Sequence, residues 1–173
     1  MAERTKIWIA DTMRKLMAKK PIDKIRVTEI CQAAEIERPT FYYHFKDKYD
    51  LVAWIFFQDA EGTNIIDIRS AAGGLNKMKQ DILFYRRAYE DTSQNALWQY
   101  MLEYFVNAYT NLAKALTEKD TLDTELLFGI RLYCYGAVGM TKEWVLTDNI
   151  TSAETLAQMM FNSMPESLKE IFF

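Results

Sequence analysis

Residues 28–48 read TEICQAAEIERPTFYYHFKDK, and this stretch decides how the rest of the chain is interpreted. Ile30, Ala33 and Ala34 have the i, i+3, i+4 spacing of one helical face. Thr28 is expected to be the N-cap of this first short helix, because its hydroxyl can accept a hydrogen bond from a free amide of the first turn. The small alanines allow a second helix to approach closely.

The second half of the stretch predicts a turn followed by another short helix. Residues 35–37 are too few for anything but a turn, and Pro39 suits a first helical turn, where its missing N–H costs nothing. Phe41 and Phe45 lie four residues apart, so both rings are expected to point inward. Asp47 is expected to cap a third helix.

The face opposite the two phenylalanines is polar. It suits the major groove of DNA, which admits one helix whose side chains reach base edges and phosphates. The candidate DNA-binding residues are Thr28, Arg38, Pro39, Thr40, Tyr42, Tyr43, His44 and Lys48. The alternative is a solvated polar face on a purely structural helix pair.

This stretch resembles the helix-turn-helix of TetR/AcrR-family transcriptional regulators. The resemblance covers residues 5–55 closely, and the residue types that match at fixed spacing are Thr28, Ala33, Ala34, Ile36, Thr40, Phe41, Tyr42, His44, Phe45 and Lys48. It implies that Thr28, Tyr42 and Lys48 bind phosphate, which fixes the position of a protein on DNA.

The resemblance also implies that Arg38, Thr40 and Tyr43 lie nearest the base edges, where sequence is read. Two residues depart from the family pattern. Glu35 stands where the family usually has Gly, and a non-Gly residue with positive φ carries a strain of roughly 1 kcal/mol, so a differently shaped turn is expected. Glu37 stands where Ser or Thr is frequent, and two carboxylates here repel a phosphate backbone.

The composition excludes several classes of protein. Half of the residues are hydrophobic, which is ample for a core, whereas only 3 Pro and 6 Gly indicate helices with few irregular loops. Cys31 and Cys134 are expected to be reduced, buried thiols of a cytoplasmic protein. No segment approaches the roughly 18 uninterrupted apolar residues of a membrane span, and no secretion signal is apparent at the start.

Catalytic and cofactor chemistry find little support in the sequence. His44 is the only histidine, so a multi-histidine metal site is excluded and no second histidine is available for a catalytic triad. Residues 71–74 lack the lysine and spacing of a phosphate-binding loop. We therefore expect no cofactor and no metal, and a small helical enzyme is the disfavoured alternative.

Charge is unevenly distributed along the chain. Residues 1–50 hold 11 Lys or Arg against 8 Asp or Glu, whereas residues 51–173 hold 10 against 16. A basic N-terminal part followed by an acidic remainder fits a DNA-binding head on a body that does not touch DNA. The alternative is that this uneven distribution arises by chance. The predicted domains are a helix-turn-helix domain at 1–47 and a helical regulatory and dimerisation domain at 48–173.

The predicted fold is all-α, with a three-helix head and a longer helical body. The head is completed by a first helix over residues 4–18. The expected features of the body are a helix from Asp47, a loop at 71–74, one helical face made of Met78, Ile82, Tyr85 and Tyr89, helices at about 93–118 and 123–146, a capping box at Thr151 and Glu154, and a short final helix after Pro165.

The helix at about 123–146 is apolar nearly all round, which indicates burial on more than one side and hence against a second copy. The resembled family uses its last two long helices for a homodimer, and this implies the interface residues Leu132, Tyr133, Gly136, Trp144, Leu156 and Met160. Aromatic and Met side chains also suggest a ligand pocket lined by Tyr85, Trp98, Met101, Tyr104 and Tyr135, with an ordinary core as the alternative.

Residues 133–145 read YCYGAVGMTKEWV and, with the capped Met-rich helix after them, resemble the subgroup near the dihydroxyacetone-kinase regulators. This resemblance implies that the signal is a protein partner in some members, and that some members activate transcription. The function we expect is a sequence-specific, homodimeric regulator of a palindromic operator, most simply a repressor released by a small-molecule or protein signal. The alternative is a protein-interaction module or coactivator of the same fold with weak or no DNA binding.

Overall fold

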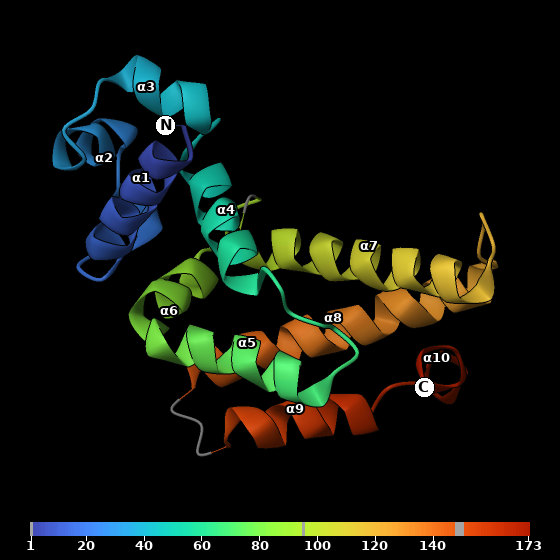
Figure 1. Cartoon of the computed structure of the whole chain (residues 1–173). Coiled ribbons are helices and arrows are strands. Elements are labelled where there is room, and N and C mark those ends of the chain that lie inside the picture. Colours follow the sequence, from blue (N-terminus) through green and yellow to red (C-terminus); the bar gives the residue numbers. More distant parts are fainter. Residues whose placement is uncertain (1, 95, 148–150) are drawn as a thin grey trace. The chain divides into compact units, whose positions relative to one another are not determined.

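The computed structural model describes residues 2–94, 96–147 and 151–173, and within these ranges its regular structure is helical throughout (Figure 1). The helices are α1 (Ala2–Met17), the 3-10 turn η1 (Ile22–Lys24), α2 (Val27–Ala33), α3 (Arg38–His44), α4 (Lys48–Ala60), α5 (Ile68–Gln80), α6 (Ile82–Glu90), α7 (Leu97–Thr117), α8 (Thr124–Leu146), α9 (Ala153–Asn162) and α10 (Glu166–Phe172). The all-α prediction is confirmed for this part of the chain. Over the same residues, no helix has both the length and the apolar character needed to cross a bilayer.

The chain divides into two compact units, which we describe separately. Unit 1 comprises Met1–Glu61 and Asp81–Leu97, and unit 2 comprises Gly62–Gln80 and Trp98–Phe173. This division differs from the predicted boundary after residue 47, because α4 and α6 both pack against α1. Unit 1 therefore includes a segment that returns from later in the sequence.

Unit 1 is built around the apolar stripe predicted for the first helix. Ile9, Met13 and Met17 of α1 have no exposed surface. They face the helix-turn-helix, whose Ile30 and Phe41 are also completely buried. Apolar burial at roughly 25 cal/mol per Å² stabilises this arrangement, although both α2 and α3 have only seven residues.

In unit 2, α5 and α9 lie side by side (Figure 1). The predicted loop at 71–74 is wrong, because these residues lie inside α5. Ala72, Leu75 and Met78 form its buried stripe, and Asn76 Nδ2 donates a hydrogen bond of 2.8 Å to a carboxylate of α9. This packing offsets the roughly 1 kcal/mol by which each helical glycine is less favourable than alanine.

The single helical face predicted from Met78 to Tyr89 is also wrong. Helix α5 ends at Gln80, and Asp81 is the N-cap residue of the next helix, α6. Met78 therefore belongs to unit 2, whereas Tyr85 and Tyr89 belong to unit 1. The carboxylate of Asp81 pairs with Arg14 of α1 instead of capping the helix. A contact across 67 residues of sequence therefore lies at this boundary.

Two predicted caps are corrected and one is confirmed. Arg26, not Thr28, is the N-cap of α2, and α2 has no side-chain cap. Ser152, not Thr151, caps α9, because its hydroxyl accepts from a backbone amide of the first turn. Asp47 caps α4 as predicted, accepting from two backbone amides at 2.8 and 2.9 Å.

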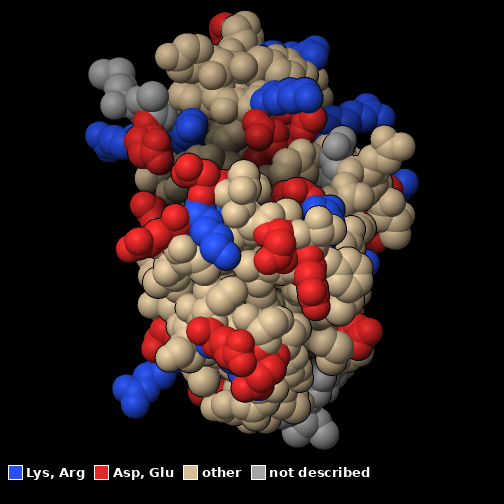
Figure 2. Space-filling model, turned by 90° about the vertical axis from the view of Figure 1, so that its right-hand side faces the viewer, with Lys and Arg blue, Asp and Glu red and all other residues tan. Residues whose placement is uncertain are grey.

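Figure 2 shows acidic side chains gathered on the face of unit 2 that is turned to the viewer, with few Lys or Arg among them. This agrees with the excess of acidic residues counted in the second part of the sequence. Such a face repels the phosphate backbone of DNA, so this face of unit 2 is unsuited to nucleic acid.

Candidate nucleic-acid interface

The two predicted aromatic anchors hold α3 in place. Phe41 is 0% exposed and Phe45 is 2% exposed, and their ring centroids lie 5.9 Å apart. Phe45 also meets the ring of Trp54 in α4 edge to face at 5.8 Å. Because both anchors lie on one side of a seven-residue helix, the opposite side is directed away from the core of unit 1.

The turn between α2 and α3 keeps the shape that a glycine normally provides. Glu35 has φ of 53°, Ile36 N–H donates to Cys31 O at 3.0 Å, and Glu35 N–H donates to Gln32 O at 3.3 Å. These bonds form a Schellman motif, in which the residue after the C-cap is left-handed. The expectation of a differently shaped turn is therefore wrong, and Glu35 carries the strain instead.

Trp8 of α1 contacts the same turn through a hydrogen bond. Its indole Nε1–H donates to Ala34 O at 2.8 Å, which satisfies a carbonyl at the end of α2. Sequence reasoning missed Trp8, because its partner lies 26 residues away and nothing in the local pattern links the two.

The polar side of α3 presents most of the predicted DNA-binding residues. Tyr43 is 79% exposed and Tyr42 is 48% exposed, whereas Thr40 and His44 are partly buried. Arg38 is exposed beside Tyr42, with its guanidinium 5.7 Å from the ring and a donor 3.4 Å from the hydroxyl.

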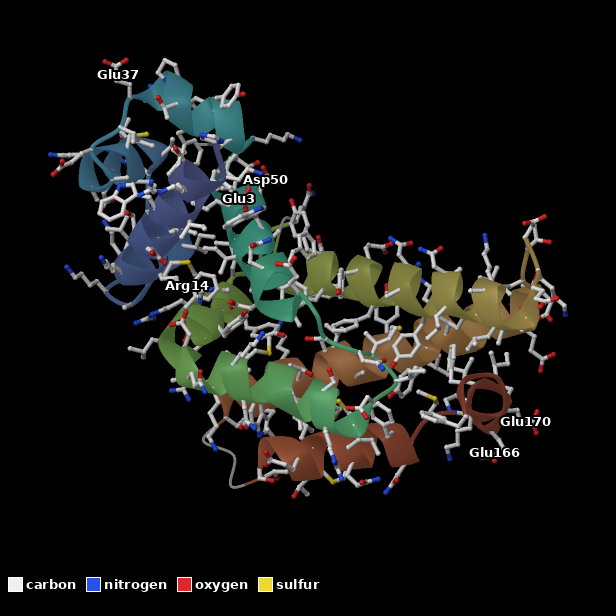
Figure 3. All side chains as sticks on the ribbon, viewed as in Figure 1. Glu3, Arg14, Glu37, Asp50, Glu166 and Glu170 are labelled. Atoms are coloured by element: carbon white, nitrogen blue, oxygen red, sulfur yellow. The ribbon has the colours of Figure 1, made fainter. Side chains whose placement is uncertain are left out.

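The first turn of α3 completes this side of the interface. Pro39 is exposed in that turn, and the acidic Glu37, which precedes the helix, points into solvent (Figure 3). The structure thus places six of the predicted residues on one short helix: Arg38, Pro39, Thr40, Tyr42, Tyr43 and His44.

The other two predicted DNA-binding residues lie outside α3. Thr28 is exposed in the first turn of α2, where a hydroxyl can reach a phosphate although it does not cap the helix. Lys48 begins α4, and its ammonium group donates to the backbone carbonyls of Ile22 and Ile25. Burial lowers the pKa of Lys48, which agrees with an ammonium directed into the protein.

The residues of the predicted ligand pocket are divided between the two units. Tyr85 is buried in unit 1, where its hydroxyl donates to Asp59, whereas the other four residues belong to unit 2. Met101 is buried in α7, and Tyr135 is half exposed on α8. Trp98 and Tyr104 are partly buried. The ligand pocket therefore stays a prediction, with an ordinary core as its alternative.

The predicted dimer residues fall into two groups. Tyr133, Trp144 and Leu156 are buried inside their own chain, where Trp144 Nε1–H donates to Thr151 O at 2.9 Å. They fill the core and are not available to a second copy. Leu132 and Gly136 are exposed on α8, and Met160 is partly buried on α9.

Helix α8, which the sequence predicts to be buried on more than one side, has one buried side and one exposed side. One side of α8 packs into the core of unit 2, and the other exposes large apolar side chains: Leu127, Phe128, Leu132, Tyr135 and Met140. Leu132 and Gly136 lie on this exposed side, together with Phe128, which is 67% exposed and which the sequence analysis did not name. The 3.6-residue period would have found it once the buried side was known.

A short helix anchored by two rings, with a polar side turned outward beyond a tight turn, is the arrangement of helix-turn-helix DNA-binding proteins. Comparison with known proteins identifies the group. The family description "Bacterial regulatory proteins, tetR family" matches residues 9–55, and "Transcriptional regulator C-terminal region" matches residues 74–166. The chain therefore belongs to the TetR family of bacterial regulatory proteins, which are transcriptional regulators and not enzymes.

Two relatives illustrate the similarity. The "HTH-type dhaKLM operon transcriptional activator DhaS" of Lactococcus lactis subsp. lactis (strain IL1403) is 39% identical over 51 residues, which is 30% of this chain and 27% of that protein. The solved structure "Dihydroxyacetone kinase operon activator DhaS" is similar in fold, with a TM-score of 0.66 and 21% identity over 96% of this chain and 97% of that one. The predicted resemblance to this subgroup is confirmed.

Proposed function

We propose that the chain binds double-stranded DNA in a sequence-specific manner and thereby controls transcription. The observation that carries the proposal is the outward polar side of α3, fixed from behind by the buried rings of Phe41 and Phe45. In this proposal Arg38, Thr40 and Tyr43 read base edges. The other four residues, Thr28, Pro39, Tyr42 and His44, contact the phosphate backbone and sugars.

The chain acts on DNA as a homodimer in this proposal. A two-fold axis places two copies of α3 in successive major grooves, about 34–36 Å apart or a multiple of that spacing. The operator is therefore palindromic. The exposed apolar side of α8 supports the choice of interface, because contiguous exposed apolar surface marks an interaction site.

A signal controls this binding. A small molecule or a protein that binds the two spacings of the α3 helices with different affinity shifts the population between them. The names of the two relatives reported above describe them as activators of an operon for dihydroxyacetone kinase. A reporter assay tests our expectation of a repressor. The operator is placed before a reporter gene, and reporter expression is compared in the cytoplasm of cells with and without the chain.

Selection of bound duplexes from a random pool tests the proposal. Enrichment of a palindrome whose half-sites are one helical turn or a multiple apart is the expected result. Binding to the enriched duplex should weaken steeply with salt, because neutralised phosphates release counterions.

The alternative function, a protein-interaction module of the same fold, is favoured by one observation. Glu35 and Glu37 are both exposed beside the candidate interface, where carboxylates repel phosphate. That alternative predicts no enrichment and no salt-dependent binding to any duplex, so the same selection separates the two functions.

A further inference from the structure

The ammonium group of Lys48 lies against the backbone that leads from α1 into α2. Its Nζ is 2.7 Å from Ile22 O, 2.9 Å from Ile25 O and 3.4 Å from Asp23 O. The side chains of Ile22 and Ile25 are 2% and 1% exposed. This turn is therefore anchored in the core of unit 1, and its carbonyl groups are directed toward the start of α4.

These contacts occupy the full donor capacity of the side chain. A lysine ammonium has three N–H donors and no acceptor, and three carbonyl oxygens of one turn lie within reach. Asp47 fixes the first turn of α4 immediately beside it, so the position of Lys48 along the helix is also set. A phosphate bound by this ammonium would have to displace at least one of the carbonyls.

The clamped turn controls where α2 begins. Ile25 is separated from the first residue of α2 by Arg26 alone, and α2 packs directly on α3. A shift of the turn would therefore move Thr28 and, through α2, the recognition surface of α3. The carbonyl at the other end of α2 is held by Trp8, so both ends of this helix are fixed by side chains from outside the motif.

We propose that Lys48 is a positioning residue, which ties the turn before α2 to α4 and so holds the helix-turn-helix in its DNA-binding geometry, and that it is not a phosphate ligand. The part of this inference that concerns DNA rests on the function proposed above.

The test compares three variants with the unchanged full chain. Lys48→Gln removes the charge and leaves two N–H donors instead of three, on a shorter side chain. Lys48→Arg keeps a cation that can bind phosphate, but its planar fork does not match three converging carbonyls. Lys46→Gln is the matched control, because Lys46 is exposed two residues away and loses the same charge.

The first measurements need no DNA. Both Lys48 variants should lower Tm by roughly 3–6 °C, as expected for lost hydrogen bonds from a charged, partly exposed group. Hydrogen exchange of peptides that cover residues 20–27 should accelerate in both, whereas Lys46→Gln should change neither quantity. Unchanged exchange in Lys48→Gln would overturn the clamp, even if no variant bound any duplex and the proposed function failed.

The second measurement is the affinity of each variant for a duplex enriched by the selection, determined at several salt concentrations. The temperature is one at which circular dichroism shows that every variant is folded. Both Lys48 variants should bind about 5–20-fold more weakly, with the slope of log K against log salt unchanged. A purely structural lysine would leave this affinity unaltered, which would overturn the positioning role. A slope smaller by about 0.9 in Lys48→Gln that Lys48→Arg restores would identify a phosphate contact and would also overturn it.

Discussion

At the scale of single residues, Glu35 is a position where a non-Gly residue adopts an unfavourable backbone conformation. Its φ of 53° lies in the left-handed region, which non-Gly residues adopt at a cost of about 1–2 kcal/mol. Glu35→Gly should therefore raise the free energy of unfolding by about 0.5–1 kcal/mol after the extra flexibility of the unfolded chain is counted. Chemical denaturation measures this change.

Glu35→Ala separates strain from charge in the same experiment. It removes the carboxylate but keeps a Cβ atom in the left-handed conformation, so its stability should stay near that of the unchanged chain. Equal gains from Glu35→Gly and Glu35→Ala would show that repulsion between charges, and not backbone strain, is the quantity being relieved.

The residue scale also shows where prediction from sequence succeeds. Phe41 and Phe45 were identified as anchors because a spacing of four residues is local information, and both are buried. Lys48 was assigned to phosphate by resemblance, and the carbonyls that it contacts lie 23–26 residues earlier in the chain. Backbone acceptors carry no residue-type signature, so no sequence pattern points to such a contact.

At the scale of elements, Arg14 joins three helices of unit 1. Its guanidinium donates to Asp59 of α4 at 2.8 Å and to Asp81 before α6, and it lies 5.0 Å from the ring of Phe84. Burial alone would lower the pKa of Arg14, but hydrogen bonds and the charges of the two carboxylates raise it. Tyr85 donates to Asp59 as well, and burial together with that carboxylate raises the pKa of its phenol.

Removing the guanidinium leaves two carboxylates without their shared cation. Arg14→Met should lower the free energy of unfolding by about 2–3 kcal/mol, which is less than for a fully buried pair because the side chains are 25–35% exposed. Adding Asp59→Asn should restore part of this loss, because a neutral amide no longer needs the cation. Denaturation of the single and double variants measures the coupling.

Arg87→Met is the comparison for this prediction. Arg87 pairs with Glu90 on the same α6, but both side chains are about 40% exposed, so the loss should stay below about 0.5 kcal/mol. Similar losses for Arg14→Met and Arg87→Met would show that the Arg14 network does not hold α6 to α1 and α4.

Elements were predicted well where local pattern and packing agree, and poorly where they disagree. The spacing of apolar residues located α1 and α8 closely. Residues 71–74 look like a loop by composition, yet they are helical because α9 covers the buried stripe of α5. At the boundary between α5 and α6, Asp81 pairs with Arg14, which no window of local sequence around Asp81 includes.

At the scale of the whole molecule, the proposed homodimer requires a surface that joins two copies. Sequence periodicity indicated that α8 needs burial on two sides, but it did not say which residues face inward. The structure makes that distinction, since Tyr133 and Trp144 fill the core whereas Phe128 and Leu132 remain 67% and 57% exposed. Replacing Trp144 would consequently test folding, and the interface must be tested at an exposed position.

Leu132→Glu is that test. In a two-fold interface every substitution occurs twice, so two carboxylates would be transferred from water into the apolar contact between the α8 helices. We expect dimer dissociation to become about 100-fold more favourable, which corresponds to roughly 1.4 kcal/mol for each copy, and sedimentation velocity should then detect monomers. Leu83→Glu is the matched control, because Leu83 on α6 is 54% exposed and the chemical change is identical. An unaltered dimer in Leu132→Glu, or equal dissociation in both variants, would place the interface on a different surface from the exposed side of α8.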